Sequence, residues 1–198
     1  MTSSGRAPSG AAVFSPSVTD AILTAVMDEW MDCGVARLSM DRVARRARVG
    51  KSALYRRWPS KVHMVTEVLA RLSVPTGPPP DTGELRGDVR AMLQATYDWL
   101  TDPRIAAVLP DLIAESQRNA ALAEATVEHV TGPRLAWARL ALERSKDRGE
   151  LRAQDVDVLL DLLIAPTFWR LVHDRPVDNC QLDRLSEVLL EGLLKEHS

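Results

Sequence analysis

Apolar residues recur every three or four positions along most of the chain, and no segment alternates between apolar and polar residues over the length of a strand. Between residues 17 and 33, Ile22, Val26 and Trp30 fall on one face of a helix, and Gly34 follows as a typical C-terminal stop. Comparable helical spacing returns in eight later segments. The pattern therefore predicts an all-α protein of about nine helices.

Two of these segments are short and lie close together in residues 39–58. Ser39 is a favourable N-cap for the first, Gly50 interrupts the pattern, and Pro59 ends the second, because the residue before a proline avoids the helical conformation. A helix-turn-helix needs exactly two such helices and a small apolar seam that fixes the angle between them. The residues expected to form this seam are Val43, Ala47, Val49, Leu54 and Trp58.

Composition divides the chain into four parts. Residues 1–16 are rich in Ser, Gly, Ala and Pro, which is typical of a disordered arm. Residues 75–83 contain four prolines and predict a stiff linker, because proline does not sustain a helix. Residues 17–74 contain the N-terminal three-helix domain with the helix-turn-helix, and residues 84–198 are expected to form a larger helical domain.

Positive charge is concentrated in the N-terminal part. Residues 1–75 contain 11 Lys and Arg against 6 Asp and Glu, whereas the whole chain has a formal net charge of −2. Within residues 39–61, eight basic residues stand against Asp41 alone. Because this basic run coincides with the two short helices, the sequence favours double-stranded DNA as the partner.

The same composition admits two other functional classes. A helical interaction protein could use the basic head to bind an acidic protein or a membrane surface, but the head lacks the large apolar face that membrane insertion needs, so we expect no membrane partner. A helical enzyme would need a catalytic triad, a phosphate-binding loop or a metal cluster, and these motifs do not appear. We therefore expect no catalysis, cofactor or metal, and the two cysteines, without a secretory signal, fit a reducing cytoplasm.

The second short helix carries hydrogen-bond donors away from its apolar seam. Arg56 is expected opposite the seam, and Lys51 lies in the first turn. Arginine can form two hydrogen bonds with guanine, whereas Lys, Ser and Tyr can bind phosphate, and alanine can offer a methyl contact to thymine. The candidate DNA-contacting residues of this helix and its flanks are Lys51, Ser52, Ala53, Tyr55, Arg56 and Arg57.

Residues 18–72 resemble the DNA-binding domain of the TetR (tetracycline-repressor) family of transcriptional regulators. The resemblance is most specific where a Leu-Tyr pair is followed by an aromatic residue, Pro, Ser and Lys, over residues 54–61. It implies that Tyr55 and Lys61 contact phosphates and that Ser39 and Arg42 lie where the preceding helix meets the DNA backbone. It also implies positions at or near the major groove for Lys51, Ser52, Ala53 and Arg57.

This chain departs from the family pattern in the turn. Arg48 stands where the family commonly has Gly, and Gly50 stands where it commonly has Ser or Thr. We expect either that Arg48 adopts the turn conformation at some cost in strain or that the turn differs. Ala53 replaces a frequent Thr, which removes one possible phosphate contact.

Residues 148–152 and 155–175 resemble the C-terminal domain of one TetR subgroup. In that group the middle helices enclose a ligand cavity and the last two long helices form a dimer interface. The resemblance implies a homodimeric repressor that binds a near-palindromic operator and responds to an effector, which we expect to be an apolar or aromatic small molecule. The candidate pocket residues, which could equally be core residues, are Met92, Thr96, Trp99, Ile113, Trp137 and Phe168.

Two leucine-rich stripes near the C-terminus are candidates for the dimer interface. They follow helical spacing in residues 156–171 and 182–193. Pairing two such helices from each chain would give a four-helix interface. The same stripes could instead face the core of their own chain. The candidate interface residues are Leu159, Leu163, Leu171, Leu182, Leu185 and Leu189.

Overall fold

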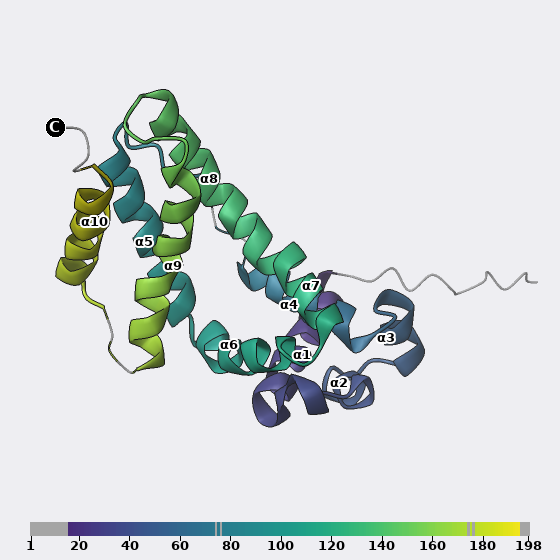
Figure 1. The fold of residues 1–198 in the computed structure, drawn as a ribbon. Coiled ribbons are helices and arrows are strands. Elements are labelled where there is room, and N and C mark those ends of the chain that lie inside the picture. The colour runs from purple at the N-terminus through teal and green to yellow at the C-terminus, as the bar shows by residue number, and fades with distance from the viewer. Residues whose placement is uncertain (1–15, 74, 76, 174, 176, 195–198) are drawn as a thin grey trace, which may run out of the picture.

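The computed structural model describes residues 16–73, 75, 77–173, 175 and 177–194, so the predicted N-terminal arm falls almost wholly outside the described residues. These residues form helices and no strand (Figure 1), which confirms the all-α prediction. A π-helical segment, η1, joins α7 to α8 without a break, so that the described residues contain nine separate helical rods. The elements are α1 (Pro16–Arg37), α2 (Met40–Arg46), α3 (Lys51–Arg57), α4 (Lys61–Ser73), α5 (Leu85–Thr101), α6 (Pro103–Ser116), α7 (Ala120–Thr126), η1 (Val127–Thr131), α8 (Gly132–Asp147), α9 (Asp155–Val172) and α10 (Asn179–Leu194).

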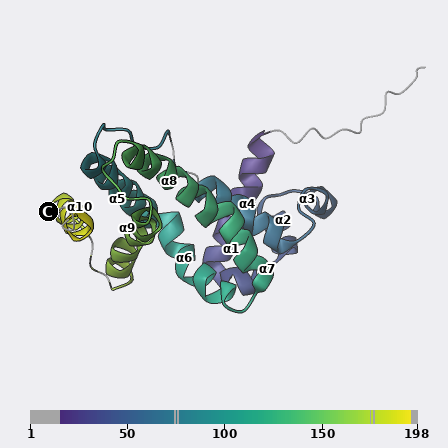
Figure 2. The ribbon, with the colours of Figure 1, turned by 45° about the horizontal axis from the view of Figure 1, so that its top comes forward.

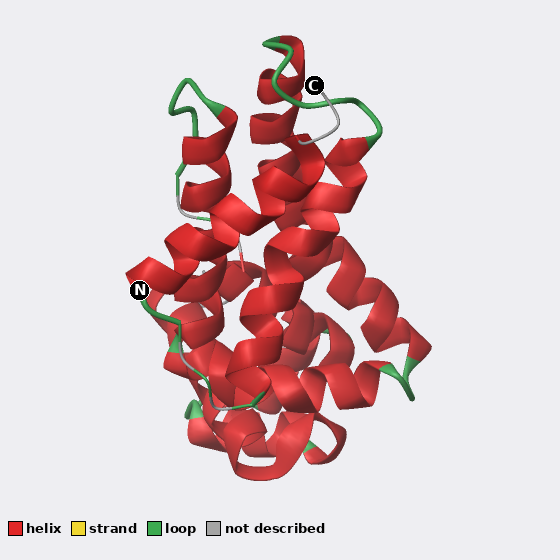
Figure 3. Cartoon of the chain, turned by 60° about the vertical axis from the view of Figure 1, so that its left-hand side comes forward, coloured by secondary structure: helices red, strands yellow, loops and turns green. Residues whose placement is uncertain are grey.

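The helices are arranged in two groups that meet along α6 and the α7–η1–α8 rod. Helices α1 to α4 lie at one end of the molecule, and α5, α9 and α10 lie at the other (Figures 1 and 2). Helix α3 is at the outer edge of the first group, far from α10. Short loops join most of the helices (Figure 3). The arrangement leaves α3 accessible at one end of the protein.

The two hydrophobic cores do not follow the boundary that the Pro-rich linker suggests. The first core contains apolar residues of α1 to α4, but it also takes Val108 and Leu112 from α6, Leu122 from α7 and Val130 from η1. The second core is built from α5, α8, α9 and α10. Helices that follow the linker therefore complete the core of the N-terminal domain.

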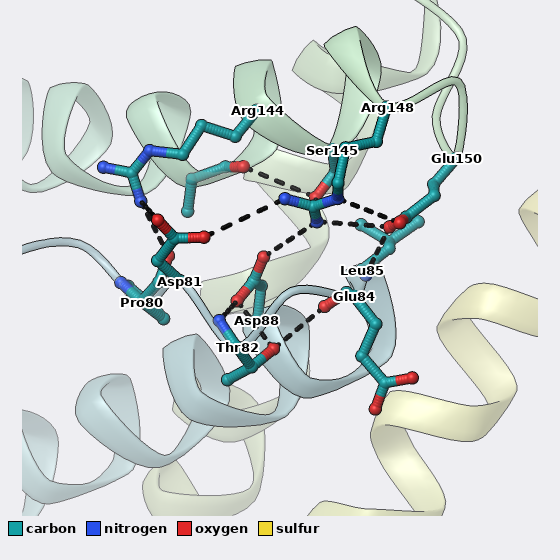
Figure 4. Close-up of polar contacts among 11 residues, drawn as sticks. Pro80, Asp81, Thr82, Glu84, Leu85, Asp88, Arg144, Ser145, Arg148 and Glu150 are labelled. Atoms are coloured by element: carbon teal, nitrogen blue, oxygen red, sulfur yellow. Dashed lines mark hydrogen bonds and ion pairs between the residues drawn. The ribbon is translucent and has the colours of Figure 1, made fainter.

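Polar contacts fix the linker and the start of α5 to the end of α8 (Figure 4). Arg148 donates to the buried carboxylate of Asp88 (3.2 Å) and to Glu150 (2.9 Å). The Glu150 carboxylate in turn accepts from the backbone N–H of Leu85 (2.6 Å), the first residue of α5. Arg144 donates to the carbonyl of Pro80 (3.1 Å) in the linker. The buried carboxylate of Asp88 is thus hydrogen-bonded and paired, as burial of charge requires.

Helix α1 is interrupted at Gly34, the residue that the sequence marks as its stop. Gly34 has φ 76° and ψ 156°, which lie outside the helical region and favour glycine. The carboxylate of Asp111, from α6, accepts hydrogen bonds there from the Trp30 indole N–H (2.6 Å) and from the backbone N–H of Val35 (2.7 Å). A Cβ atom at position 34 would lie 3.1 Å from Asp111 Oδ1. Helix α6 therefore caps the break in α1.

The turn between α2 and α3 places Arg48 in the left-handed region, with φ 55°. The backbone N–H of Val49 bonds to Ala44 O (3.0 Å), and that of Arg48 bonds to Arg45 O (3.2 Å), which is the Schellman pattern at a helix C-terminus. Gly50, by contrast, is extended, with φ −69° and ψ 139°. Arg48 thus adopts the turn conformation that relatives make with glycine, whereas position 50 does not require glycine.

Replacing Arg48 by glycine should stabilise the protein. A non-glycine residue in the left-handed region costs about 1–2 kcal/mol, and the extra freedom of glycine in the unfolded chain offsets part of the gain. We expect the free energy of unfolding to rise by about 0.5–1 kcal/mol. Urea unfolding at a fixed protein concentration measures it. Gly149 occupies the equivalent position after α8, with φ 79°. Gly149→Ala should therefore lower the free energy of unfolding, because it places a non-glycine residue in the left-handed region. A lower unfolding midpoint for Arg48→Gly than for the wild type would contradict the inference that the backbone is strained at Arg48.

Candidate DNA-binding surface and interior cavities

An apolar seam holds α3 against α2 and α4, as the sequence predicts. Leu54 and Trp58 are buried, and they share the first core with Val43. Ala47 and Val49 are partly buried against the same core. The indole N–H of Trp58 also donates to Glu67 Oε2 (2.6 Å), which ties the end of α3 to α4. The orientation of α3 is therefore fixed by packing and by a partly buried hydrogen bond.

The opposite face of α3 presents polar side chains to solvent. Lys51, Ser52, Tyr55 and Arg56 are exposed, and Ala53 is half-buried beside them. The ammonium of Lys51 pairs with Asp41, and both side chains are exposed. Exposed pairs of this kind contribute little stability, so a phosphate can replace Asp41 as the partner of Lys51. A single helix face thus combines a cation, a hydroxyl, a phenol and a guanidinium.

Arg57 is held inside the N-terminal domain. Its guanidinium donates to Thr19 Oγ1 (2.8 Å) on α1 and to Glu67 Oε1 (3.1 Å) on α4, and it lies 4.9 Å from the centroid of the Trp58 ring. The side chain is 30% exposed. Arg57 thus braces α3 against α1 and α4, and its predicted position at or near the major groove stays a prediction.

The other predicted backbone-contacting residues also make contacts within the chain. Arg42 pairs with the buried carboxylate of Glu29 and donates to Arg37 O (2.8 Å). Lys61 donates to Ala36 O (2.8 Å), and Ser39 is half-buried at the N-cap of α2 without the side-chain hydrogen bond that the sequence suggested. Arg42 is itself exposed, and its predicted contact with the DNA backbone stays a prediction.

Three exposed arginines near the turn were not among the predicted DNA contacts. Arg45 and Arg46 are in the last turn of α2, where Arg46 pairs with Asp32, and Arg48 is in the turn itself. Their charges enlarge the basic surface that begins at Lys51. The sequence shows them as part of the basic run, but only the backbone conformation at position 48 shows that this side chain leaves the helix.

Two adjoining cavities lie in the C-terminal part of the molecule. The first, of about 210 Å³, is enclosed by α5, η1, α8 and α9, and we call it the α5–α9 cavity. The second, of about 540 Å³, is lined by residues of α5, α6, α7, η1 and α9. Trp99, Thr131 and Ile164 contribute to both cavities. The candidate pocket residues divide between them: Met92, Thr96, Trp99 and Trp137 line the first, and Trp99, Ile113 and Phe168 line the second.

Hydrogen bonds join the cavity wall to the last turn of α4, the helix that follows the recognition helix α3. The indole N–H of Trp99 donates to Leu72 O (3.1 Å), and Arg134 donates to Ser73 O (3.0 Å). Helix α4 also packs against α7 and η1. Short π-helical segments inside α-helices are frequent at functional sites. A change in the cavity can therefore reach α4 through direct contacts.

The predicted dimer leucines face the core of their own chain. Leu159, Leu163 and Leu182 are buried in the second core, and Leu185 and Leu189 are partly buried against it. Leu171 is half-buried. Leu159 and Leu182 are fully buried by their own chain, which favours the alternative that they are core residues; their place at an interface stays a prediction. The exposed apolar side chains of the same region are Leu135 and Leu140 on α8, Val158, Ile164, Trp169 and Val172 on α9, and Val188 on α10.

The described residues include neither a grouping of His, Cys, Asp and Glu that could hold a metal nor a helix long and apolar enough to cross a membrane.

Known proteins resemble the chain in both of its parts. The family described as "Bacterial regulatory proteins, tetR family" matches residues 22–68, and "Tetracyclin repressor-like, C-terminal domain" matches residues 79–189. The chain is 31% identical to the uncharacterized HTH-type transcriptional regulator YdeS of Bacillus subtilis over 153 residues, 77% of each protein. It is 30% identical to the DNA-binding transcriptional repressor TetR of Mycobacteroides abscessus over 181 residues, 88% of this chain and 93% of the relative. The crystal structure of the TetR family transcription regulator SCO0332 is 32% identical, with a TM-score of 0.65 over 89% of this chain and 98% of that one.

Proposed function

Because the chain belongs to the TetR family of DNA-binding transcriptional regulators, we propose that it is a homodimeric repressor that leaves its operator when a small molecule fills the interior cavities. One observation carries this proposal. The exposed face of α3 presents Lys51, Ser52 and Tyr55 on a helix that packing holds in a fixed orientation. Side chains on such a helix can read base edges in the major groove and bind the flanking phosphates.

A second copy of the chain is the proposed partner of the exposed apolar surface on α9. Val158, Trp169 and Val172 are each at least 48% exposed on this one helix. A symmetric dimer uses the same surface on both subunits, so this surface would be buried against itself. Two-fold symmetry would place the two α3 helices about 34–36 Å apart, in successive major grooves of a near-palindromic site.

The effector is proposed to act by favouring one arrangement of α4. The cavity wall is bonded to Leu72 and Ser73, and α4 begins only a few residues after α3 ends. A ligand shifts a conformational equilibrium only through its different affinities for the two states. We expect the hydrogen bonds from the cavity wall to Leu72 and Ser73 to change when the cavity fills, which gives the ligand different affinities for the two arrangements of α4. The distance between the two α3 helices of the dimer would change with the arrangement of α4.

Selection of a duplex from a random DNA library tests the function directly. The full chain should enrich a near-palindromic sequence, and its affinity for that sequence should fall steeply as salt is raised, because phosphate contacts release counterions. Protection from cleavage should appear in two half-sites about one helical turn apart. Failure to enrich any duplex, with binding to acidic proteins or anionic vesicles instead, would favour an interaction protein with a basic head.

A further inference from the structure

Arg134 is a cation in the wall of the α5–α9 cavity. Its guanidinium lies 4.2 Å from the centroid of the Trp99 ring and donates to Ser73 O (3.0 Å). Among the residues that the structure describes, no carboxylate pairs with it within 4.0 Å. Its two direct contacts are thus an aromatic face and the carbonyl end of α4. Arg134 and Trp99 also line a neighbouring cavity of about 640 Å³ whose wall includes Asp98 and Asp102, neither of which pairs with the guanidinium.

Paired arginines elsewhere in the chain show the contrast. The hydrogen bonds that Arg148 donates to Glu150 and Asp88 raise the pKa of Arg148, whereas burial lowers the pKa of Arg134 to about 10. Arg134 is still charged at neutral pH, but it has lost hydration without gaining an anion. The residue is half-buried, and a charge that is withdrawn from water is ordinarily paired. The cavity thus contains a positive group that an anion can neutralise.

The rest of the cavity wall suits an apolar molecule. Met92, Leu160, Leu163 and Ile164 contribute aliphatic surface, and the Trp99 ring contributes an aromatic one. The indole N–H groups of Trp99 and Trp137 already donate to Leu72 O and Gly77 O, so neither is available to a ligand while those bonds persist. Asp161 also lines the cavity, but its side chain is exposed, where solvent and salt screen its charge.

We propose that the effector is an apolar acid, whose anionic group pairs with Arg134 while its body fills the α5–α9 cavity. The pairing draws Arg134 away from Ser73 O at the C-terminus of α4. A cation stabilises a helix C-terminus, so this withdrawal loosens the last turn of α4 and gives the effector a route to α3. This inference rests on the proposed function and adds the chemical class of the effector.

Two dyes with one aromatic body test the preference for an anion. Anilinonaphthalenesulfonate carries a sulfonate, and N-phenylnaphthylamine is neutral. Fluorescence titration of the full chain should show affinity for the sulfonate dye about 10- to 100-fold higher, as expected for hydrogen bonds to a charged group. Arg134→Gln should remove this preference and Arg134→Lys should keep part of it. Arg144→Gln is the matched control, because Arg144 lies on the same helix and also donates to a carbonyl, but does not line the cavity.

Operator binding by the same preparations separates this inference from the proposed function. The sulfonate dye at saturation should weaken operator binding by the wild type at least tenfold, and by Arg134→Gln much less. Equal affinities for the two dyes, no binding of either, or a preference that survives Arg134→Gln would overturn the anion site. A preference that depends on Arg134 but leaves operator affinity unchanged would overturn the link to α4. Failure of the dye-free protein to bind any operator would instead count against the proposed function.

Discussion

Replacing Lys51 and Tyr55 together by alanine should weaken operator binding by about 100-fold or more, because each lost phosphate or base contact is worth about 1–3 kcal/mol. Both side chains are exposed on α3, and neither belongs to the seam around Leu54 and Trp58. The fold should therefore be unchanged. Fluorescence anisotropy with a selected operator, repeated at several salt concentrations, measures the loss. The dependence of log affinity on log salt should also become shallower by about one unit when the Lys51 charge is removed.

Two arginine variants are controls for this result. Arg86 is exposed on α5, far from the N-terminal domain, so Arg86→Ala should leave operator affinity unchanged. Arg57→Ala should chiefly lower the free energy of unfolding, because it removes the hydrogen bonds that Arg57 donates to Thr19 and Glu67. Wild-type affinity in the Lys51 and Tyr55 double variant would show that another surface binds DNA.

Trp169→Asp should convert the dimer to a monomer and, as a consequence, reduce operator affinity at least 100-fold. Trp169 is 64% exposed on α9. Its ring packs against the His173 ring in an edge-to-face arrangement, with the two ring centroids 4.5 Å apart. Large aromatic residues at the centre of an interface commonly contribute 2 kcal/mol or more to binding, and an aspartate there would bury an unpaired charge in each subunit. Sedimentation velocity measures the change in oligomeric state, and circular dichroism confirms that the helices remain.

A different exposed apolar residue distinguishes this interface from a general effect of surface charge. Met31 is 46% exposed on α1, so Met31→Asp introduces the same charge away from α9 and should leave the dimer intact. A dimer that persists in Trp169→Asp at micromolar concentration would exclude the exposed α9 surface as the interface.

Local signals in the sequence predict the helices and the seam of the helix-turn-helix well. Helical periodicity places the rods, and the spacing of Leu54 and Trp58 gives the buried face of α3, because both depend on residues a few positions apart. Glycine and proline mark most of the breaks. The left-handed conformation of Arg48 was expected only because relatives carry glycine there.

Features that depend on residues distant in sequence could not be predicted in the same way. Arg57 is a basic residue on α3, like the other predicted DNA contacts. Its guanidinium, however, is held by hydrogen bonds to Thr19 and Glu67, which belong to two other helices. Leucine stripes show that a helix has an apolar face without showing whether its own chain or a second copy covers it, and here Leu159 and Leu182 are covered by their own chain. Six residues chosen as pocket candidates do line the two cavities, but the unpaired state of Arg134 is visible only in three dimensions.

The carboxylate of Asp111 that closes the break in α1 limits how this regulator can be re-engineered. A chimaera made by joining residues 1–74 to the C-terminal part of another regulator would exchange Asp111, Val108 and Leu112 for foreign residues. The Trp30 indole and the Val35 amide would then lose their acceptor, and the transplanted head would have an incomplete core. Operator specificity is better transferred by grafting the exposed face of α3 alone, because that face makes no contribution to the junction with α6.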